Sequence, residues 1–335
     1  MRAGRPAASI HPPTGAHPVR SLLLGLLLVL GAAATPAHAA YPERPVSIIV
    51  SVGPGAGPDV IARILADRLT HLWGHQVLVV NRPGGGGIIA AQAAALANPD
   101  GYTLFMPVSS AFTVLPESRT KTSVDIATDF SLIGFIGDQP MMIGAAPSLG
   151  VSTLQDFIAL AKQRPNEILY GASRLSLPHM TGELLQLRAD IKLGYVPTTG
   201  AAKVIQDIMS GNLSVVIDSM PGIAGAVQNG DVKLLAVASD RRLTNYPNVP
   251  LVRDTLPNFE PARGWFVLMA PAKTPEPIVR QLEADLRKVL VDPELKEKFE
   301  AIDTFPRPLS TAETLEYIRA EQDLWRPIVR QIGSE

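Results

Sequence analysis

The chain has 335 residues, of which 46% are hydrophobic and only 5% aromatic, and its formal net charge is −1. It contains no cysteine, which excludes disulfide scaffolds, cysteine-ligated zinc and thiol catalysis. A chain of this length has room for two domains whose apolar cores need no covalent cross-link. We therefore expect a two-domain globular protein that is stabilised by packing.

The first 40 residues have the pattern of an export signal. Three arginines, the last of them Arg20, precede the apolar run LLLGLLLVLGAAA, and small residues stand at Ala37 and Ala39. This order of basic, apolar and small residues predicts a signal peptide over residues 1–40, cleaved after Ala39. A membrane anchor over residues 21–40 is the alternative, because a span needs about 20 apolar residues. The Ala, Thr, Pro and His residues in the second half of that run favour cleavage.

Without residues 1–40 the chain would keep 27 basic and 31 acidic side chains, a net charge of −4. That balance offers no basic surface for nucleic acid or for an anionic membrane. We therefore expect an exported protein of the bacterial periplasm with no nucleic-acid partner.

After the leader, short β-branched runs alternate with amphipathic helices. The expected strands of a first series are residues 46–50, 76–80 and 103–107, and the expected helices are residues 59–73 and 88–97. This strand–helix–strand order predicts a parallel sheet covered on both faces.

A second series of the same kind begins near Met141. Its expected strands are residues 167–171, 192–196, 213–218 and 233–238, and its expected helices are residues 153–163, 179–187, 201–211 and 222–230. A proline-rich irregular stretch precedes a returning strand at 265–271 and helices at 276–290 and 311–332. Ser152 with Gln155, and Ser310 with Glu313, have the spacing of capping boxes. The two series form either two consecutive domains or two lobes that the chain crosses more than once.

The first glycine-rich turn, SVGPGAGPD at 51–59, lies between a strand and a helix. Its glycines let a ligand approach the main chain, and the first turn of the following helix offers unpaired N–H groups at a positive dipole end. Together they make a site for a carboxylate or a phosphate. Asp59 would satisfy some of these donors itself, so a merely tight turn is the alternative. The stretch lacks the third glycine of G-x-G-x-x-G, and the chain has no phosphate-binding G-x-x-x-x-G-K-[ST] motif.

Other turns that follow expected strands could also contact a ligand. NRPGGGG at 81–87 repeats the donor arrangement of the first turn, while Ser109 and Ser110 offer hydroxyls. In the second series, VPTTGAA at 196–202 offers hydroxyls and amides at a helix start. Asp218 ends a strand, where it would either accept a hydrogen bond from a ligand ammonium or hydroxyl or cap the next helix.

The sequence contains few residues in patterns that are typical of catalytic or metal-binding sites. After the leader the only histidines are His71, His75 and His179. The first two stand four apart without an acidic partner at ligand spacing, which favours a solvated pair over a metal site. A triad of Ser109, His179 and Asp218 has no support from spacing, and no G-x-S-x-G or H-E-x-x-H motif is present. We therefore expect neither an enzyme, a metal nor a cofactor; an exported hydrolase is the weaker alternative.

The turns, taken in order, resemble those of the Bug/TctC receptors, the extracytoplasmic solute-binding proteins of tripartite tricarboxylate transporters. The motifs that carry the resemblance are YPERPVSIIV, VGPGAGPD, VNRPGGGG, PDGYTL, VPTTGAA, VVIDSMP, GDVKLLAVASDRR, YPNVPLVRDT and WFVLMAPAKTP. They extend over essentially the whole chain after the leader. The resemblance implies a type II periplasmic-binding-protein fold, with two α/β lobes and a ligand cleft between them. Residues 41–143 with 264–335 would form lobe 1, and residues 144–263 would form lobe 2.

The resemblance also implies how a ligand is held: backbone amides and water grip one carboxylate, and hydroxyls flank it. The residues at the corresponding positions are Gly53, Pro54, Gly55, Ala56, Gly86, Ser109, Ser110, Thr199, Gly200 and Ala201, with Ser173 and Asp218 toward the distal end. The implied partners are a small organic carboxylate and integral-membrane transporter subunits, or a sensor kinase, and the receptor is expected to be a monomer.

The chain departs from the family pattern at several of these positions. Ala56 replaces a glycine of the first turn, and Ile88 stands where Asn is common. The sequence Arg174-Leu175-Ser176 stands where G-N-G-like residues are usual, and Thr198-Thr199 replaces a frequent Tyr-Lys pair. These departures leave the selectivity at the distal end open, and Arg174 would either pair with a second carboxylate or simply be solvated.

Overall fold

The computed structural model describes residues 1, 4, 41–117 and 123–332. The predicted signal peptide therefore lies outside the described residues, apart from Met1 and Gly4. The chain divides into two units, residues 1–43 and residues 44–335, and the fold below is that of the second unit.

The first sheet is built from the first expected series. Strand β1 (Val46–Val50) pairs in parallel with β2 (Val77–Asn81) and with β3 (Thr103–Met106). Helices α2 (Gly57–Trp73) and α3 (Ile88–Ala95) connect them. The predicted parallel arrangement is confirmed for these three strands.

A 16-residue strand, β4 (Phe130–Ala145), joins this sheet to the next. Its first part pairs antiparallel with β9 (Arg263–Pro271), which also pairs antiparallel with β3. Its last part, from Met141 to Ala145, pairs with β7 (Val215–Ser219) and β8 (Lys233–Ala238). One strand thus belongs to both sheets, and the chain crosses between them near Pro140.

The second sheet is built from the second series. Strands β6 (Gly194–Pro197), β5 (Leu169–Ala172) and β7 run parallel to one another. The helices of this part are α5 (Leu154–Gln163), α6 (Leu177–Ala189), α7 (Ala201–Met209) and α8 (Met220–Gln228).

The remaining elements are short segments and the C-terminal helices. The short elements are the one-turn helices α4 (Ser110–Thr113) and α9 (Val252–Thr255), the short strand β10 (Phe305–Pro306), which pairs with β4, and the 3₁₀ turns Gly85–Gly87, Leu115–Glu117 and Pro147–Leu149. The helices are α10 (Glu276–Leu290), α11 (Pro293–Glu300) and α12 (Thr311–Ile332).

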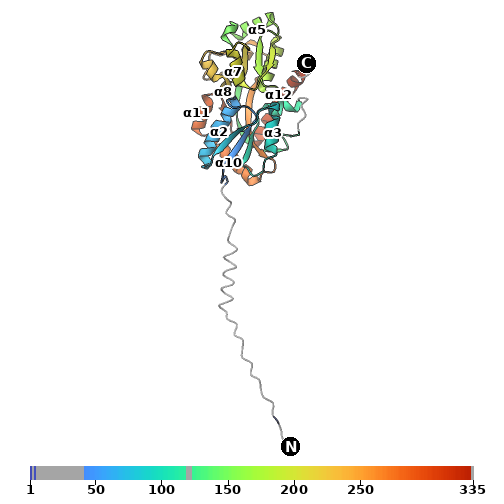
Figure 1. The fold of residues 1–335 in the computed structure, drawn as a ribbon, viewed down its shortest axis with the longest axis vertical. Coiled ribbons are helices and arrows are strands. Elements are labelled where there is room, and N and C mark those ends of the chain that lie inside the picture. The colour runs from blue at the N-terminus through green and yellow to red at the C-terminus, as the bar shows by residue number, and fades with distance from the viewer. Residues whose placement is uncertain (2–3, 5–40, 118–122, 333–335) are drawn as a thin grey trace. The chain divides into compact units, whose positions relative to one another are not determined.

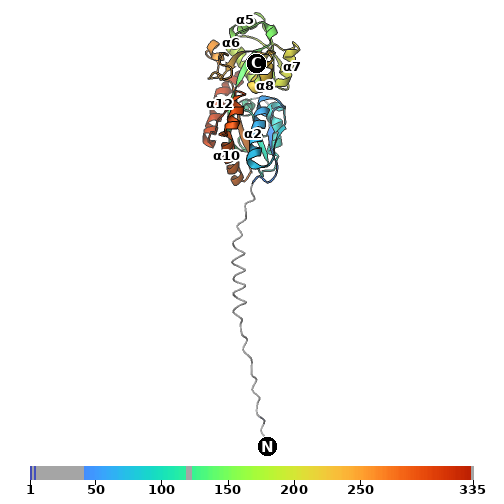
Figure 2. The same ribbon diagram turned by 90° about the vertical axis from the view of Figure 1, so that its left-hand side faces the viewer.

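We call the part around β1, β2, β3 and β9 the first lobe and the part around β5, β6, β7 and β8 the second lobe. Helices α5, α6, α7 and α8 gather in the second lobe, whereas α2 and α10 lie in the first (Figure 1, Figure 2). The end of α12 packs into the second-lobe core through Trp325, Ile328 and Val329. The residue boundaries predicted for the lobes stay a prediction.

One of the two expected capping boxes is confirmed and the other is shifted. Ser310 and Glu313 exchange the expected hydrogen bonds, with Glu313 N–H donating to Ser310 Oγ over 3.2 Å. At α5 the expected Ser152–Gln155 box is wrong, because Thr153 and Asp156 form it. The hydroxyl of Ser152 instead accepts a hydrogen bond from Lys233 Nζ, at 2.8 Å.

None of the helices within the described ranges combines the length and the apolar content that a membrane span requires.

Candidate ligand-binding site

The turns singled out in the sequence lie at the carboxyl ends of parallel strands in both lobes, where α/β sheets bind ligands. The two lobes touch along this edge, as two glycines of the first lobe show. A Cβ built on Gly57 would lie 2.3 Å from Ser219 Oγ, and one built on Gly86 would lie 3.4 Å from Leu175 Cβ. Gly57 begins α2 in the first lobe and Ser219 is the N-cap of α8 in the second. The predicted turns of the two lobes are therefore neighbours in space.

The first turn uses part of its own backbone. Gly55 N–H donates to Asp59 Oδ2 over 2.9 Å, and Ala56 N–H donates to Gly53 O over 3.4 Å. Within the described part of the chain, the N–H groups of Gly53, Gly57 and Asp59 have no partner. The donors open to a ligand are therefore Gly53 N–H and the N–H groups at the start of α2, whereas those of Gly55 and Ala56 are already paired.

The buried carboxylate of Asp59 holds this turn in place through hydrogen bonds. It is 2% exposed and accepts hydrogen bonds from Gly55, from Arg63 Nε and from Asn81 Nδ2, the last at 2.8 Å. Burial alone would raise the pKa of Asp59, but the hydrogen bonds from Arg63, Asn81 and Gly55 hold that pKa below its usual value of 3.8. The alternative interpretation of the sequence, in which Asp59 pairs with donors of its own turn, is therefore confirmed for the N–H of Gly55.

We expect Asp59→Ala to lower the free energy of unfolding by about 2–4 kcal/mol, because three donors lose a buried charged acceptor. Urea denaturation checks this value. Because the folded pKa lies below the unfolded one, the stabilisation exists above about pH 4 and disappears as the pH falls further. The difference in the free energy of unfolding between wild type and variant should become smaller on acidification. A difference that stays constant down to pH 3 would contradict this role.

The second glycine turn is held in a conformation that only glycine adopts easily. Gly84, Gly85, Gly86 and Gly87 all have positive φ, from 59° to 120°. A Cβ on Gly86 would also lie 3.1 Å from Leu115 Cδ2. Backbone conformation thus explains all four glycines, and at Gly86 the close approach of Leu175 from the second lobe is a second reason.

Ser109 and Ser110 lie at the N-terminal end of α4 and are 3% and 2% exposed. The main chain of Ser109 accepts hydrogen bonds from Phe112 and Thr113. Neither serine hydroxyl is bonded to another residue that the structure describes. Both hydroxyls therefore stay available as donors at the end of β3.

The turn of the second lobe leaves more of its backbone unpaired. Thr198 N–H donates to Ala172 O over 3.0 Å, but the N–H groups of Thr199, Gly200 and Ala201 have no partner among the described residues. Gly200 is the N-cap of α7, with φ 138°. Thr198 Oγ1 is buried and unpartnered within the same part of the chain. This helix start has the donors that an anion requires.

Asp218 lies beside that helix start. A Cβ on Gly222 would contact both Ala201 Cβ, at 3.1 Å, and Asp218 Oδ1, at 3.2 Å. Asp218 Oδ1 accepts hydrogen bonds from Ser219 N–H, at 2.7 Å, and from Ser219 Oγ. Burial raises the pKa of Asp218 to about 6, because these two hydrogen bonds compensate only part of the lost hydration.

Two buried polar residues at this edge were not predicted. Ser51 Oγ and Gln139 Oε1 are buried without a hydrogen-bond partner in the described structure. Ser51 follows β1 and lies against Gly87, and Gln139 lies on β4 against Gly57. Ser51 stood within the quoted first turn, whereas nothing in the sequence marked Gln139.

Ser173 and His179 lie at the end of β5. Ser173 O accepts from the N–H and the hydroxyl of Ser176, at 3.1 and 2.6 Å. His179 stacks on Tyr195 with ring centroids 4.1 Å apart, and its Nδ1 accepts from Leu175 N–H. Burial, with the nearby charge of Arg174, lowers the pKa of His179 to about 4. The polar contacts of its ring are with Leu175 and Glu183, which gives no support to the triad with Ser109 and Asp218.

The described ranges contain no cluster of three side chains that could together bind a metal ion. His71 is exposed, and its Nδ1 lies 2.7 Å from Asp67 O.

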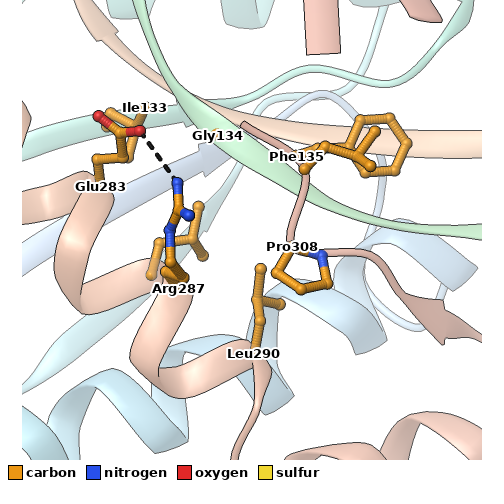
Figure 3. Close-up of a pocket in the computed structure, with 9 residues that line it drawn as sticks. Ile133, Gly134, Phe135, Glu283, Arg287, Leu290 and Pro308 are labelled. Carbon is orange, nitrogen blue, oxygen red and sulfur yellow. Dashed lines mark hydrogen bonds and ion pairs between the residues drawn. The ribbon is translucent and has the colours of Figure 1, made fainter. Parts of the chain in front are cut away.

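A small pocket elsewhere in the first lobe is not suited to a ligand. It lies between α10 and the segment after β10 and is lined by residues that include Phe135, Glu283, Arg287 and Pro308 (Figure 3). Its cavity volume is about 10 Å³, enough for a single water. Glu283 and Arg287, which both line it, form an ion pair along α10 at 3.4 Å.

Two α/β lobes joined by a shared strand, with helix starts converging where they meet, define a solute-binding protein of the periplasmic type. The profile described as "Tripartite tricarboxylate transporter family receptor", TctC, matches residues 61–334. The chain belongs to this family of receptors. It is accordingly a binding protein of a tripartite transporter rather than an enzyme.

Individual relatives agree with this assignment. Protein BugT of Bordetella pertussis is 31% identical over 321 residues, which cover 93% of this chain and 97% of BugT. The structure of R. palustris Rpa4515 with adipate is 28% identical with a TM-score of 0.84, and covers 88% of this chain and 98% of Rpa4515. The structure of the periplasmic binding protein BugD is 26% identical with a TM-score of 0.82, and the match covers 88% of this chain and 99% of BugD. The predicted family and the predicted fold class are confirmed.

Proposed function

We propose that this receptor captures a small organic carboxylate between its lobes and delivers it to the membrane subunits of a tripartite transporter. The observation that carries the proposal is the set of unpaired N–H groups at the starts of α2 and α7, which lie in opposite lobes. Helix starts of this kind bind anions without a basic side chain.

The buried polar groups at the same edge support an anionic, hydrogen-bonding ligand. The hydroxyls of Ser51 and Thr198 are buried and unpartnered in the described structure. A buried donor without a partner costs about 1–3 kcal/mol, and a carboxylate or the water around it would remove that cost. The adipate carried by a relative of 28% identity agrees with a small carboxylate.

The binding step that we propose has no covalent chemistry and needs no cofactor. Gly57, Asp59, Thr199, Gly200 and Ala201 donate backbone N–H groups, and Ser109 and Ser110 contribute hydroxyls. Closure of the lobes removes water and strengthens these contacts, so that the closed form is the one that holds ligand. We further propose that the receptor is exported by its N-terminal segment, with cleavage after Ala39, and works as a monomer in the periplasm.

A thermal-shift screen of residues 40–335 tests the proposal. Adipate, succinate and hexanoate are compared with adipamide, which has the same chain length as adipate but no charge. A carboxylate at 100 times its dissociation constant should add about 2.7 kcal/mol to the free energy of unfolding. We expect at least one carboxylate to raise the melting temperature by several degrees and adipamide to leave it unchanged. If no carboxylate shifts the transition, the proposed function is wrong.

A further inference from the structure

The loop between β5 and α6 presents an arginine at the place where the two lobes meet. Ser176 N–H donates to Ser173 O over 3.1 Å, which makes residues 173–176 a tight turn with Arg174 at its second position. Leu175, at the third position, has φ 60° and lies against Gly86 of the first lobe. The turn therefore extends across the junction, and Arg174 stands beside the contact.

The turn is held rigidly from below. His179 Nδ1 accepts from Leu175 N–H at 3.3 Å, and His179 stacks on Tyr195. Tyr195 in turn donates its hydroxyl to Ala172 O at 3.1 Å, at the end of β5. Left-handed backbone is uncommon for leucine, and here the histidine and the packing on Gly86 maintain it. The position of Arg174 is thus fixed by its neighbours rather than left to a free loop.

Arg174 has no counter-ion among the described residues. Of the arginines that the structure describes, those whose side chain makes no hydrogen bond or ion pair are Arg82, Arg174 and Arg319. The charge of Arg174 nonetheless acts on its surroundings, because it contributes to the lowered pKa of buried His179. An unpaired cation on an ordered turn at the lobe junction is available to an anionic group that enters between the lobes.

We propose that Arg174 binds a second carboxylate of the ligand, so that the receptor selects dicarboxylates over monocarboxylates. This inference rests on the proposed function, in which the helix starts of α2 and α7 hold the first carboxylate. The two ends would then differ in chemistry: backbone amides at one end and a guanidinium, which pairs with carboxylates in a bidentate manner, at the other.

The test measures binding of adipate and of its monoamide, adipamate, by titration calorimetry to the mature wild type and three variants. We expect wild type to bind adipate at least tenfold more tightly than adipamate. Arg174→Gln should reduce that ratio to about one while adipamate affinity changes less than threefold, and Arg174→Lys should keep an intermediate ratio. Arg319→Gln, which removes the exposed and unpartnered arginine of α12, serves as the matched control and should leave the ratio unchanged.

The outcomes separate the inference from the function on which it rests. If wild type binds both ligands equally, or if Arg174→Gln keeps the preference for adipate, the receptor function stands and the role of Arg174 is wrong. If Arg174→Gln weakens both ligands equally, the residue supports the loop and does not select, which also overturns the proposal. If wild type binds no carboxylate of any length, both fail. The melting temperature of each free variant, expected within 1 °C of wild type, checks that folding is intact.

Discussion

Replacing Gly57 by alanine should weaken carboxylate binding at least tenfold and lower the free energy of unfolding by about 1–3 kcal/mol. The new methyl group would lie 2.3 Å from Ser219 Oγ and 3.0 Å from Gln139 Nε2, distances that force these neighbours apart. Both belong to other segments, Ser219 to the second lobe and Gln139 to the shared strand. The methyl group therefore lies between the lobes where the unpaired N–H groups converge, and the Ser219 hydroxyl and the Gln139 amide must turn away from it.

Two further variants make this expectation specific. Gly225→Ala, inside α8, meets no atom within 4 Å and should stabilise the protein by about 0.5–1 kcal/mol, because alanine is the better helix former. Ser219→Ala in the Gly57→Ala background removes the closest atom and should restore part of both losses. Ser219 makes no side-chain cap to α8, so its hydroxyl is dispensable there. Urea denaturation and calorimetry give the two readouts, and wild-type affinity in Gly57→Ala would contradict the convergence.

Most of the longer helices could be predicted because their apolar periodicity is regular and their ends are marked, whereas α11 and the short helices α4 and α9 were not predicted. Helix α10 was predicted at residues 276–290 and is observed at Glu276–Leu290. The short buried strands β1 and β8 were also predicted with their observed bounds, Val46–Val50 and Lys233–Ala238. In these elements the local sequence alone decides the structure.

The shared strand β4 could not be predicted in the same way. The segment FSLIGFIGDQPMMIGA contains glycines and a proline that normally indicate turns, and the second series was expected to begin only near Met141. The partners of its first part are β9 and β10, far along the chain, and a Cβ on Gly137 would lie 2.6 Å from Phe305 O. That glycine is required by a tertiary contact, which no local pattern reports.

In the candidate site, too, some features follow from the local sequence and others from tertiary contacts. Glycine-rich turns after strands identified the edge at which both lobes meet, since their composition reflects backbone conformation. Which N–H groups stay unpaired depends on Asp59, whose side chain takes the Gly55 donor. The part played by Gln139 depends on the crossing of β4 beside α2. The pairing of Gly55 with Asp59 and the position of Gln139 both result from three-dimensional packing, so they could not be predicted from the sequence.

Asp218 should make ligand binding depend on pH, and Asp218→Asn should remove that dependence. Its carboxylate lies beside Ala201 at the start of α7, where the proposed function puts a ligand carboxylate. Two like charges at close range repel, by roughly 2–3 kcal/mol for a separation on the order of 5 Å at an effective dielectric constant of 20–40. A bound anion therefore raises the pKa of Asp218 above its value of about 6 in the free receptor, and binding takes up a proton.

The sign of the effect follows from linkage. Above about pH 6 the free receptor has Asp218 ionised, so affinity for adipate should rise up to tenfold for each unit of acidification from pH 8 toward pH 6. Below pH 6 Asp218 is already protonated and contributes no further rise in affinity. Asp218→Asn should bind at pH 7.5 about tenfold more tightly than wild type and show no slope. Calorimetry in buffers of different ionisation enthalpy measures the proton uptake directly. If Asp218 instead accepts a ligand ammonium, the asparagine variant loses affinity for amino acids, and adipate binding shows no proton uptake in either protein.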